Sequence, residues 1–190
     1  MSEGWAAALA AFAGALSAPL FAFFQHSWEH KRNRRSLAIR LAVVLEKFAE
    51  DCASNIDDER LYLESKGLFG SLCDGIPELM PYPSDADWKL LNPNLLDRVL
   101  SFEPDLLSSE QQILFFDKAC GPPDHDTRIE ECCRCGNLAW ELATELRHRH
   151  GFVPKVGTNT PSILKQAHEM HQSKTKKRDE RNASKKDVAP

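Results

Sequence analysis

The chain has 190 residues, 42% of them hydrophobic, and a formal net charge of −4. This length allows one modest domain with a core of its own. The six cysteines are irregularly spaced, which excludes the disulfide framework of a small secreted protein and favours reduced thiols in a cytosolic domain.

The first feature along the chain is an uncharged stretch from Trp5 to Phe24. As a helix with a rise of about 1.5 Å per residue, residues 5–28 would span roughly 34 Å, which matches a bilayer core of about 30 Å. We therefore predict a transmembrane anchor over residues 1–28. The side chains expected to hold it in the membrane are Trp5, Phe12, Leu16, Leu20, Phe24 and Trp28.

A basic juxtamembrane segment follows at residues 29–35. Its cations are Lys31, Arg32, Arg34 and Arg35, and no Lys or Arg precedes them. The positive-inside rule then predicts a single-pass protein of the plasma (inner) membrane, with its N-terminus outside and its C-terminal domain in the cytoplasm. These four side chains are expected to contact lipid headgroups. A cleaved secretory signal and a buried soluble helix are the alternatives for the apolar stretch.

Small residues recur at every fourth position of this stretch, at Ala6, Ala10, Gly14, Ala18 and Ala22. They share one helix face, where two backbones could approach closely, so the pattern is compatible with self-association of the span. An alanine-rich helix also produces such a row by chance.

Residues 36–154 are predicted to form an acidic helical domain. The apolar residues Leu37, Leu41, Leu45 and Phe48 are three or four positions apart, which predicts an amphipathic helix from Ser36 to about Ser54. The pattern does not decide the structure of residues 57–76, because glycines interrupt it.

Proline and capping residues mark the later elements. Residues 77–83 contain three prolines and must form a connector. Asn92 followed by Pro93 predicts a helix start, and Pro104 is expected to open a further helix. Thr127 and Glu130 form a capping box before the last long helix, which Gly151 ends.

Residues 155–190 are rich in lysine and arginine and are predicted to form a mostly disordered tail. The tail mixes acidic residues with the basic ones and lacks the aromatic side chains that stack on bases, so we do not expect it to bind nucleic acid.

Three clustered cysteines are the only pattern that suggests chemistry. Cys132, Cys133 and Cys135 could contribute to a metal site or a redox switch, but they lie in a helical stretch without the paired Cys-x2-Cys turns that zinc prefers. Burial as small core residues is the alternative that we favour, and we assign no metal or cofactor.

The sequence contains no phosphate-binding glycine loop, nucleophile elbow, zinc-protease helix or kinase signature. We therefore predict a non-enzymatic interaction or scaffold role with an unknown protein partner. The alternatives are a thiol- or metal-based sensor that uses the clustered cysteines and a prophage-type membrane-lesion protein that acts through the apolar stretch.

Three segments carry a resemblance to known proteins: residues 45–52, 87–91 and 139–147. In the spacing of their apolar residues, the chain resembles uncharacterised bacterial single-pass membrane proteins with a helical cytoplasmic domain. The resemblance implies an architecture and no activity. The predicted fold class is all-α, with one N-terminal transmembrane helix, an irregular cytoplasmic helical bundle and a disordered tail.

Overall fold

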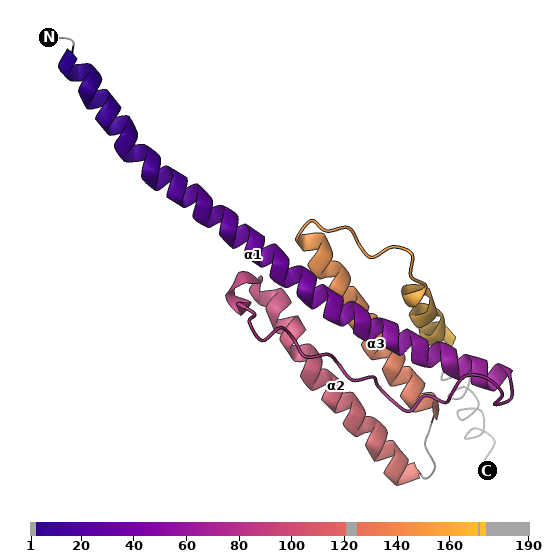
Figure 1. The fold of residues 1–190 in the computed structure, drawn as a ribbon. Helices are drawn as coiled ribbons and strands as arrows, with labels where there is room; N and C mark the ends of the chain where they lie inside the picture. The colour runs from indigo at the N-terminus through magenta and orange to yellow at the C-terminus, as the bar shows by residue number, and fades with distance from the viewer. Residues whose placement is uncertain (1–2, 121–124, 171, 174–190) are drawn as a thin grey trace, which may run out of the picture.

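A long helix runs through the molecule, and the other helices pack along it (Figure 1). The computed structural model describes residues 3–120, 125–170 and 172–173, with side chains from Gln25 onward except at positions 120 and 125. Helix α1 spans Glu3–Glu64, the 3-10 helix η1 Trp88–Leu90, α2 Pro93–Cys120 and α3 His125–Arg149. Residues 160–170 form a further helical segment. No strand occurs within these described ranges, so the all-α class is confirmed for them.

The core lies mainly between α1 and α3. Buried residues of α1 recur every three or four positions, from Leu37 through Leu45 and Phe48 to Ile56. This spacing places them on one face of the helix, and α3, which runs antiparallel to α1, covers that face (Figure 1). The helix predicted from Ser36 is thereby confirmed, and it continues to Glu64.

Helix α2 packs on the bundle along a single seam. Its buried apolar residues are Leu95, Val99, Phe102, Leu106 and Ile113. The Phe102 ring packs edge to face on the Phe48 ring of α1, with 5.4 Å between the ring centroids. The predicted start is confirmed, because α2 begins at Pro93 and Asn92 Oδ1 accepts a hydrogen bond from the amide of Asn94 at 3.1 Å. Pro104, however, lies inside α2 and does not begin a new helix. The seam continues on both sides of Pro104, so core packing keeps the two parts in one helix.

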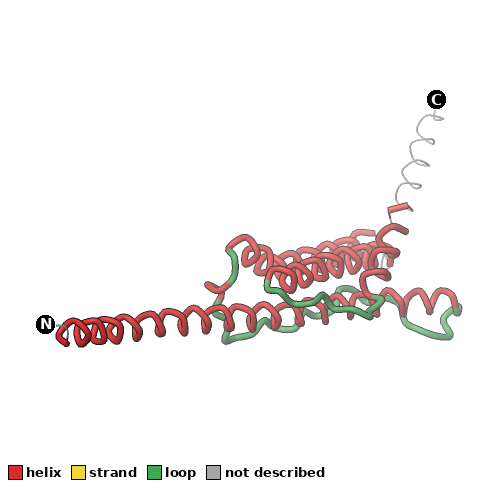
Figure 2. The backbone as a smooth tube through the Cα atoms, turned by 90° about the horizontal axis from the view of Figure 1, so that it is seen from above, coloured by secondary structure: helices red, strands yellow, loops and turns green. Residues whose placement is uncertain are grey.

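The proline-rich connector runs back along the bundle from the end of α1 to the start of α2 (Figure 2). Tyr82 fixes it, because its hydroxyl donates to the Val99 carbonyl at 3.0 Å and its ring packs against Trp88. The predicted end of the last long helix is also confirmed. Gly151 adopts a φ of 71° after α3, and the Phe152 amide donates to the Arg147 carbonyl at 2.9 Å.

The membrane assignment requires correction. Among the described residues, no helix is both long enough and apolar enough to cross a bilayer. This finding contradicts the predicted transmembrane helix over residues 1–28 and the single-pass inner-membrane location with its N-terminus outside. The side chains of residues 3–24, which include the apolar stretch, lie outside the described part.

The described side chains of α1 offer no span either. Residues 25–36 are exposed and strongly charged. Beyond them, α1 buries one face against α3 and carries charged side chains such as Arg40 and Lys47 on the other. Between residues 25 and 64, these charges leave no uncharged stretch long enough to cross a bilayer.

Candidate functional site

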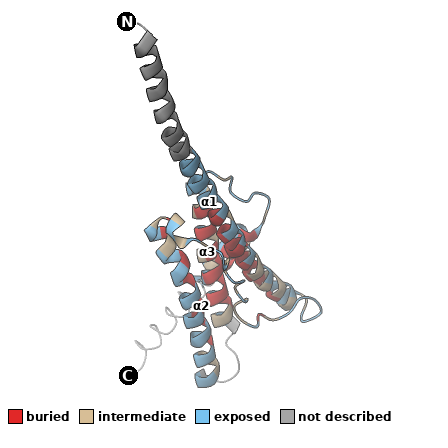
Figure 3. Cartoon of the chain, turned by 60° about the vertical axis from the view of Figure 1, so that its left-hand side comes forward, coloured by how far each residue is buried: buried red, intermediate tan, exposed pale blue. Residues whose placement is uncertain are grey.

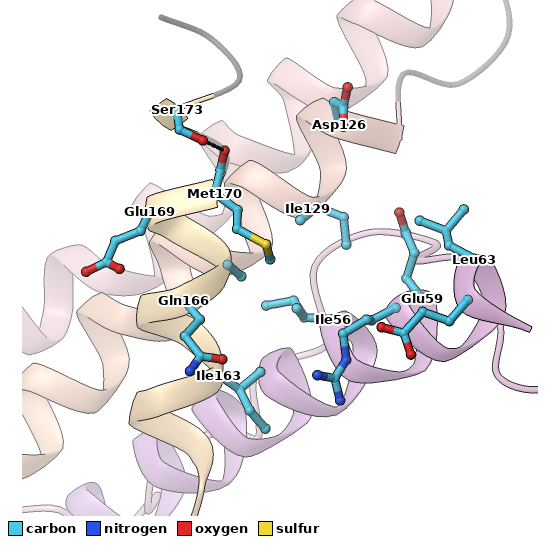
Figure 4. Close-up of a pocket in the computed structure, with 13 residues that line it drawn as sticks. Ile56, Glu59, Leu63, Asp126, Ile129, Ile163, Gln166, Glu169, Met170 and Ser173 are labelled. Atoms are coloured by element: carbon cyan, nitrogen blue, oxygen red, sulfur yellow. Dashed lines mark hydrogen bonds between the residues drawn. The ribbon is translucent and has the colours of Figure 1, made fainter. Parts of the chain in front are cut away.

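A groove of about 800 Å³ lies at the C-terminal end of α1. Three elements line it: the last turns of α1, the first turns of α3 and the helical segment that begins at residue 160 (Figure 4). Its apolar side chains are Ile56, Leu63, Ile129, Ile163, Ala167 and Met170. Figure 4 shows Ile56, Ile129, Ile163 and Met170 directed toward a common space.

A glycine lets the helical segment 160–170 approach the bundle and form one wall of the groove. A Cβ atom at Gly136 of α3 would lie 2.8 Å from Leu164 Cδ2 and 2.9 Å from Cys52 Cβ, closer than side chains pack. Without that atom, Leu164 enters the core and is fully buried. Asn137 strengthens the contact, because its Nδ2 donates to the Leu164 carbonyl at 3.5 Å.

The edge of the groove is acidic. Its charged residues are Glu59, Glu64, Asp126 and Glu169 on the negative side and Arg60 on the positive side. Glu59 is buried and accepts a hydrogen bond from the Cys73 amide at 2.8 Å, so it also holds the connector in place. Arg60 pairs with Asp57 at 2.6 Å. The groove therefore combines apolar walls with an excess of carboxylates at its edge.

An exposed apolar turn follows the end of α1. Leu68 and Phe69 are 79% and 70% exposed, although both are large apolar residues. The hydroxyl oxygen of Ser65 accepts from the Phe69 amide at 2.8 Å, which fixes the turn. Gly67 and Gly70 have φ values of 86° and 77°, a conformation that glycine adopts without strain. The chain thus displays two apolar side chains on a fixed backbone.

The clustered cysteines do not form one site. Cys132, Cys133 and Cys135 are all buried, as the packing interpretation predicts. Cys132 Sγ lies 3.7 Å from the Cys52 carbonyl of α1, whereas Cys135 Sγ lies 3.7 Å from the Ser109 hydroxyl of α2. Within the described residues, no group of three or more His, Cys, Asp or Glu side chains could hold a metal ion.

The thiols are also poorly suited to redox chemistry. Interactions with neighbouring thiols and burial raise the pKa values of Cys73 and Cys132 above their ordinary range. Burial raises the pKa of Cys133 to about 12 and also raises the pKa of Cys135. A reactive cysteine needs the opposite shift, because the thiolate is the nucleophile.

Of the residues predicted to contact the membrane, the structure describes the side chains of Trp28 and the four juxtamembrane cations. Trp28 is 77% exposed on α1, and the other predicted anchor residues have side chains outside the described part. Lys31, Arg32, Arg34 and Arg35 are exposed, and the Arg35 guanidinium lies 5.1 Å from the centre of the Phe152 ring. The contact with lipid headgroups predicted for these four side chains depended on the membrane location, which the structure contradicts. The small residues from Ala6 to Ala22 likewise lie outside the described side chains.

The sequence analysis does not predict the groove, because it assigns residues 155–190 to a single tail. A signal was present in the sequence. Thr160 and Pro161 resemble a helix start, and Ile163, Leu164 and Ala167 have the spacing of one helix face. Residues 174–190, the other part of the predicted tail, lie outside the description.

Comparison with known proteins adds no relative. No protein family, no curated protein and no solved structure matches this chain. The resemblance to bacterial single-pass membrane proteins therefore stays a prediction, and any functional argument has to come from the geometry described above.

Proposed function

We propose that the protein is a non-enzymatic interaction protein whose groove binds a basic amphipathic helix of a partner protein. The observation that carries this proposal is the combination of apolar walls and a carboxylate edge in the groove between α1, α3 and the helical segment that begins at residue 160. An amphipathic helix in a hydrophobic groove is a recurrent mode of protein recognition.

The walls of the groove offer a partner helix an apolar surface. The converging side chains are Ile56, Ile129, Ile163 and Met170 (Figure 4). Methionine is unbranched and adapts to different partner surfaces.

The charge at the edge favours a basic partner. Four carboxylates and one guanidinium line the groove; Arg60 is paired with Asp57 at 2.6 Å, and Lys165 Nζ lies 4.0 Å from Glu169 Oε1. Lysine and arginine on the polar face of a bound helix would meet Glu64 and Glu169, whereas an acidic helix would be repelled. Complementary charge of this kind mainly sets the choice of partner and the association rate.

A binding experiment with synthetic helices tests the proposal. One labelled peptide carries leucine at helix positions i, i+3, i+4 and i+7 and lysine or arginine at the other positions, and a matched peptide carries glutamate there. We expect the full chain to bind the basic peptide, with an affinity that falls as salt is added, and not the acidic one. Fluorescence anisotropy measures both. Equal binding of the two peptides would overturn the proposal.

A pair of methionine substitutions locates the binding surface. Met170 lines the groove and is 54% exposed, whereas Met80 lies in the connector and is 53% exposed. We expect Met170→Lys to weaken binding of the basic peptide by about tenfold or more, which corresponds to about 1.4 kcal/mol. Met80→Lys should leave it unchanged. The same loss in both variants would place the binding elsewhere.

A partner in cells is identified by crosslinking from the groove. A photoreactive residue at Gln166, which lines the groove, is compared with one at Gln112, which is exposed on α2. The proposal requires a crosslink from position 166 alone, to a partner segment that is basic and amphipathic. A crosslinked segment that is acidic or extended would contradict it.

A further inference from the structure

One segment of α1 carries positive charges that the described chain leaves unpaired. Residues 25–36, the projecting segment, are all exposed and contain four cations against one carboxylate, Glu29 (Figure 3). In the bundle, every described arginine from Arg40 to Arg149 pairs with a carboxylate. The described arginines without an ion pair are Arg32, Arg34 and Arg35. The unpaired guanidinium groups of the described chain therefore all lie in the projecting segment.

Trp28 adds a large apolar surface to the same segment, because it is 77% exposed. Residues four and seven positions apart lie on one face of an α-helix, so Arg32 and Arg35 lie on the side of Trp28. Arg34 is six positions from Trp28 and lies on a different side. Tryptophan and arginine are among the side chains that most often dominate the binding energy of protein interfaces. One face of the projecting segment is therefore suited to bind a surface that is both apolar and acidic.

We propose that the partner helix of the function proposed above, on which this inference rests, is the projecting segment of a second copy of this chain. Trp28 packs against the apolar walls of the groove, and the cations beside it meet the carboxylates at the groove edge. Among these carboxylates, Glu64 is exposed and forms no ion pair with another described residue. Complementary charge of this kind selects the partner and its orientation.

The two surfaces lie at opposite ends of the bundle and cannot meet within one molecule. Helix α1 is continuous from Glu3 to Glu64, and the groove lies against its last turns (Figure 1). With a rise of about 1.5 Å per residue, roughly 48 Å of helix separates Trp28 from Arg60 at the groove. The helix holds them apart, so the contact requires a second copy.

Complementation between two defective variants tests the proposal. Trp28→Ala removes the aromatic side chain from the projecting segment, and Met170→Lys places a cation in the groove wall. We expect the full chain to associate, and each variant alone to need about tenfold or more higher concentration for the same association. An equimolar mixture of the two should form dimers at the lower concentration, because it retains one intact segment and one intact groove. Sedimentation equilibrium measures the masses.

The same experiment can overturn the proposal in three ways. The full chain can stay monomeric. The two variants can associate as strongly as the unsubstituted chain, which would place the contact on other surfaces. Their mixture can associate no better than either variant alone, which would show that the segment and the groove do not bind each other.

A matched pair of charge reversals locates the binding face of the segment. Arg32→Glu and Arg34→Glu change the net charge equally, but only Arg32 lies on the side of Trp28. At physiological ionic strength, where screening acts over about 8 Å, Arg32→Glu should raise the dissociation constant by at least about tenfold and Arg34→Glu should raise it clearly less. Equal effects would show that net charge alone drives the association, and would overturn the proposal.

The basic peptide of the binding experiment separates this proposal from the one on which it rests. The peptide should dissociate the assembly of the full chain at concentrations that saturate the groove of Trp28→Ala, and the acidic peptide should not. If the basic peptide binds the groove while the full chain stays monomeric, the groove keeps its proposed function and the second copy is not its partner. An assembly that persists with a saturated groove would also overturn the proposal.

Discussion

At the scale of single residues, two similar arginine pairs differ in how far they are removed from water. Arg147 of α3 binds the Glu46 carboxylate of α1 through two nitrogens, one of them at 2.8 Å, and the two side chains are only 15% and 5% exposed. Arg40 binds Asp85 in the same two-pronged way, but these side chains are 45% and 69% exposed. Because the two pairs share this geometry, the difference in burial decides what each pair contributes to the stability of the fold.

Removing the two arginines should therefore have different effects. Arg147→Met leaves a buried, unpaired carboxylate, and we expect it to lower the free energy of unfolding by about 3–5 kcal/mol. Arg40→Met should cost no more than about 1 kcal/mol, since water solvates Asp85. Urea unfolding measures both. Adding Glu46→Leu to Arg147→Met should recover much of the loss, and equal costs for the two single variants would contradict this account.

His150 gives the protein a defined response to acid. Burial lowers the pKa of His150, and the cations Arg34, Arg149 and Arg35 lower it further. The unfolded chain therefore takes up a proton at this residue more readily than the folded chain. Stability is retained while histidine is neutral in both states and is lost as the pH falls below about 6.5, the ordinary histidine pKa.

A melting experiment checks this residue. Between pH 7.5 and pH 5.5, the range that contains the ordinary histidine pKa of about 6.5, we expect the melting temperature of the full chain to fall. His150→Gln should show a smaller fall. His148→Gln, a substitution at an exposed neighbour, serves as the control and should keep the full response. A fall that is unchanged in His150→Gln would show that other groups carry it.

At the scale of elements, the turn after α1 depends on a close approach between two backbones. A Cβ atom at Gly70 would lie 2.1 Å from the Asp58 carbonyl oxygen, whereas one at Gly75 would meet nothing within 4 Å. Both glycines have a positive φ, at 77° and 143°. Any side chain is strained at either position, but only Gly70 has a steric conflict as well.

Alanine substitutions separate these two effects. Gly75→Ala should cost about 1–2 kcal/mol through backbone conformation alone, and Gly70→Ala should cost more because the turn has to move away from α1. Urea unfolding gives the costs. Hydrogen exchange of the Phe69 amide, which donates to Ser65, should become faster only in Gly70→Ala. Equal costs and unchanged exchange would show that the turn adapts without difficulty.

At the scale of the whole molecule, the cysteines report on how completely the helices pack together. Cys52 comes from α1, Cys73 from the connector and three further thiols from α3, and all five are buried and free. Their protection requires every one of these elements to be in place. It also bears on the thiol-sensor alternative, which requires an accessible thiol of low pKa.

Thiol labelling in a Cys120→Ser background measures this protection. We expect the five remaining cysteines to react slowly with Ellman's reagent in the folded chain, because they are buried and the pKa values of Cys73, Cys132, Cys133 and Cys135 are raised. Denaturant should make all five react quickly. A thiol that reacts rapidly in the folded protein would revive the sensor alternative.

The sequence by itself determined the features that depend on neighbouring residues. The all-α class, the start of α2 at Asn92 and Pro93 and the stop at Gly151 follow from periodicity, capping and backbone freedom, and each is confirmed. The assignment of Pro104 as a helix start failed, because core contacts on both sides of it outweigh the local preference of proline. The predicted membrane location was wrong, since no helix among the described residues is both long enough and apolar enough to cross a bilayer.

Only the tertiary structure decided the groove and which leucines of α2 stay exposed. Ile56, Ile129 and Ile163 look alike as candidate core residues in the sequence, and packing alone shows that they border an open space. Leu106 and Leu107 are adjacent leucines, yet the first is 5% exposed and the second 54%. Which apolar residues stay in contact with water depends on how many helices cover them, and contacts between distant segments set that number.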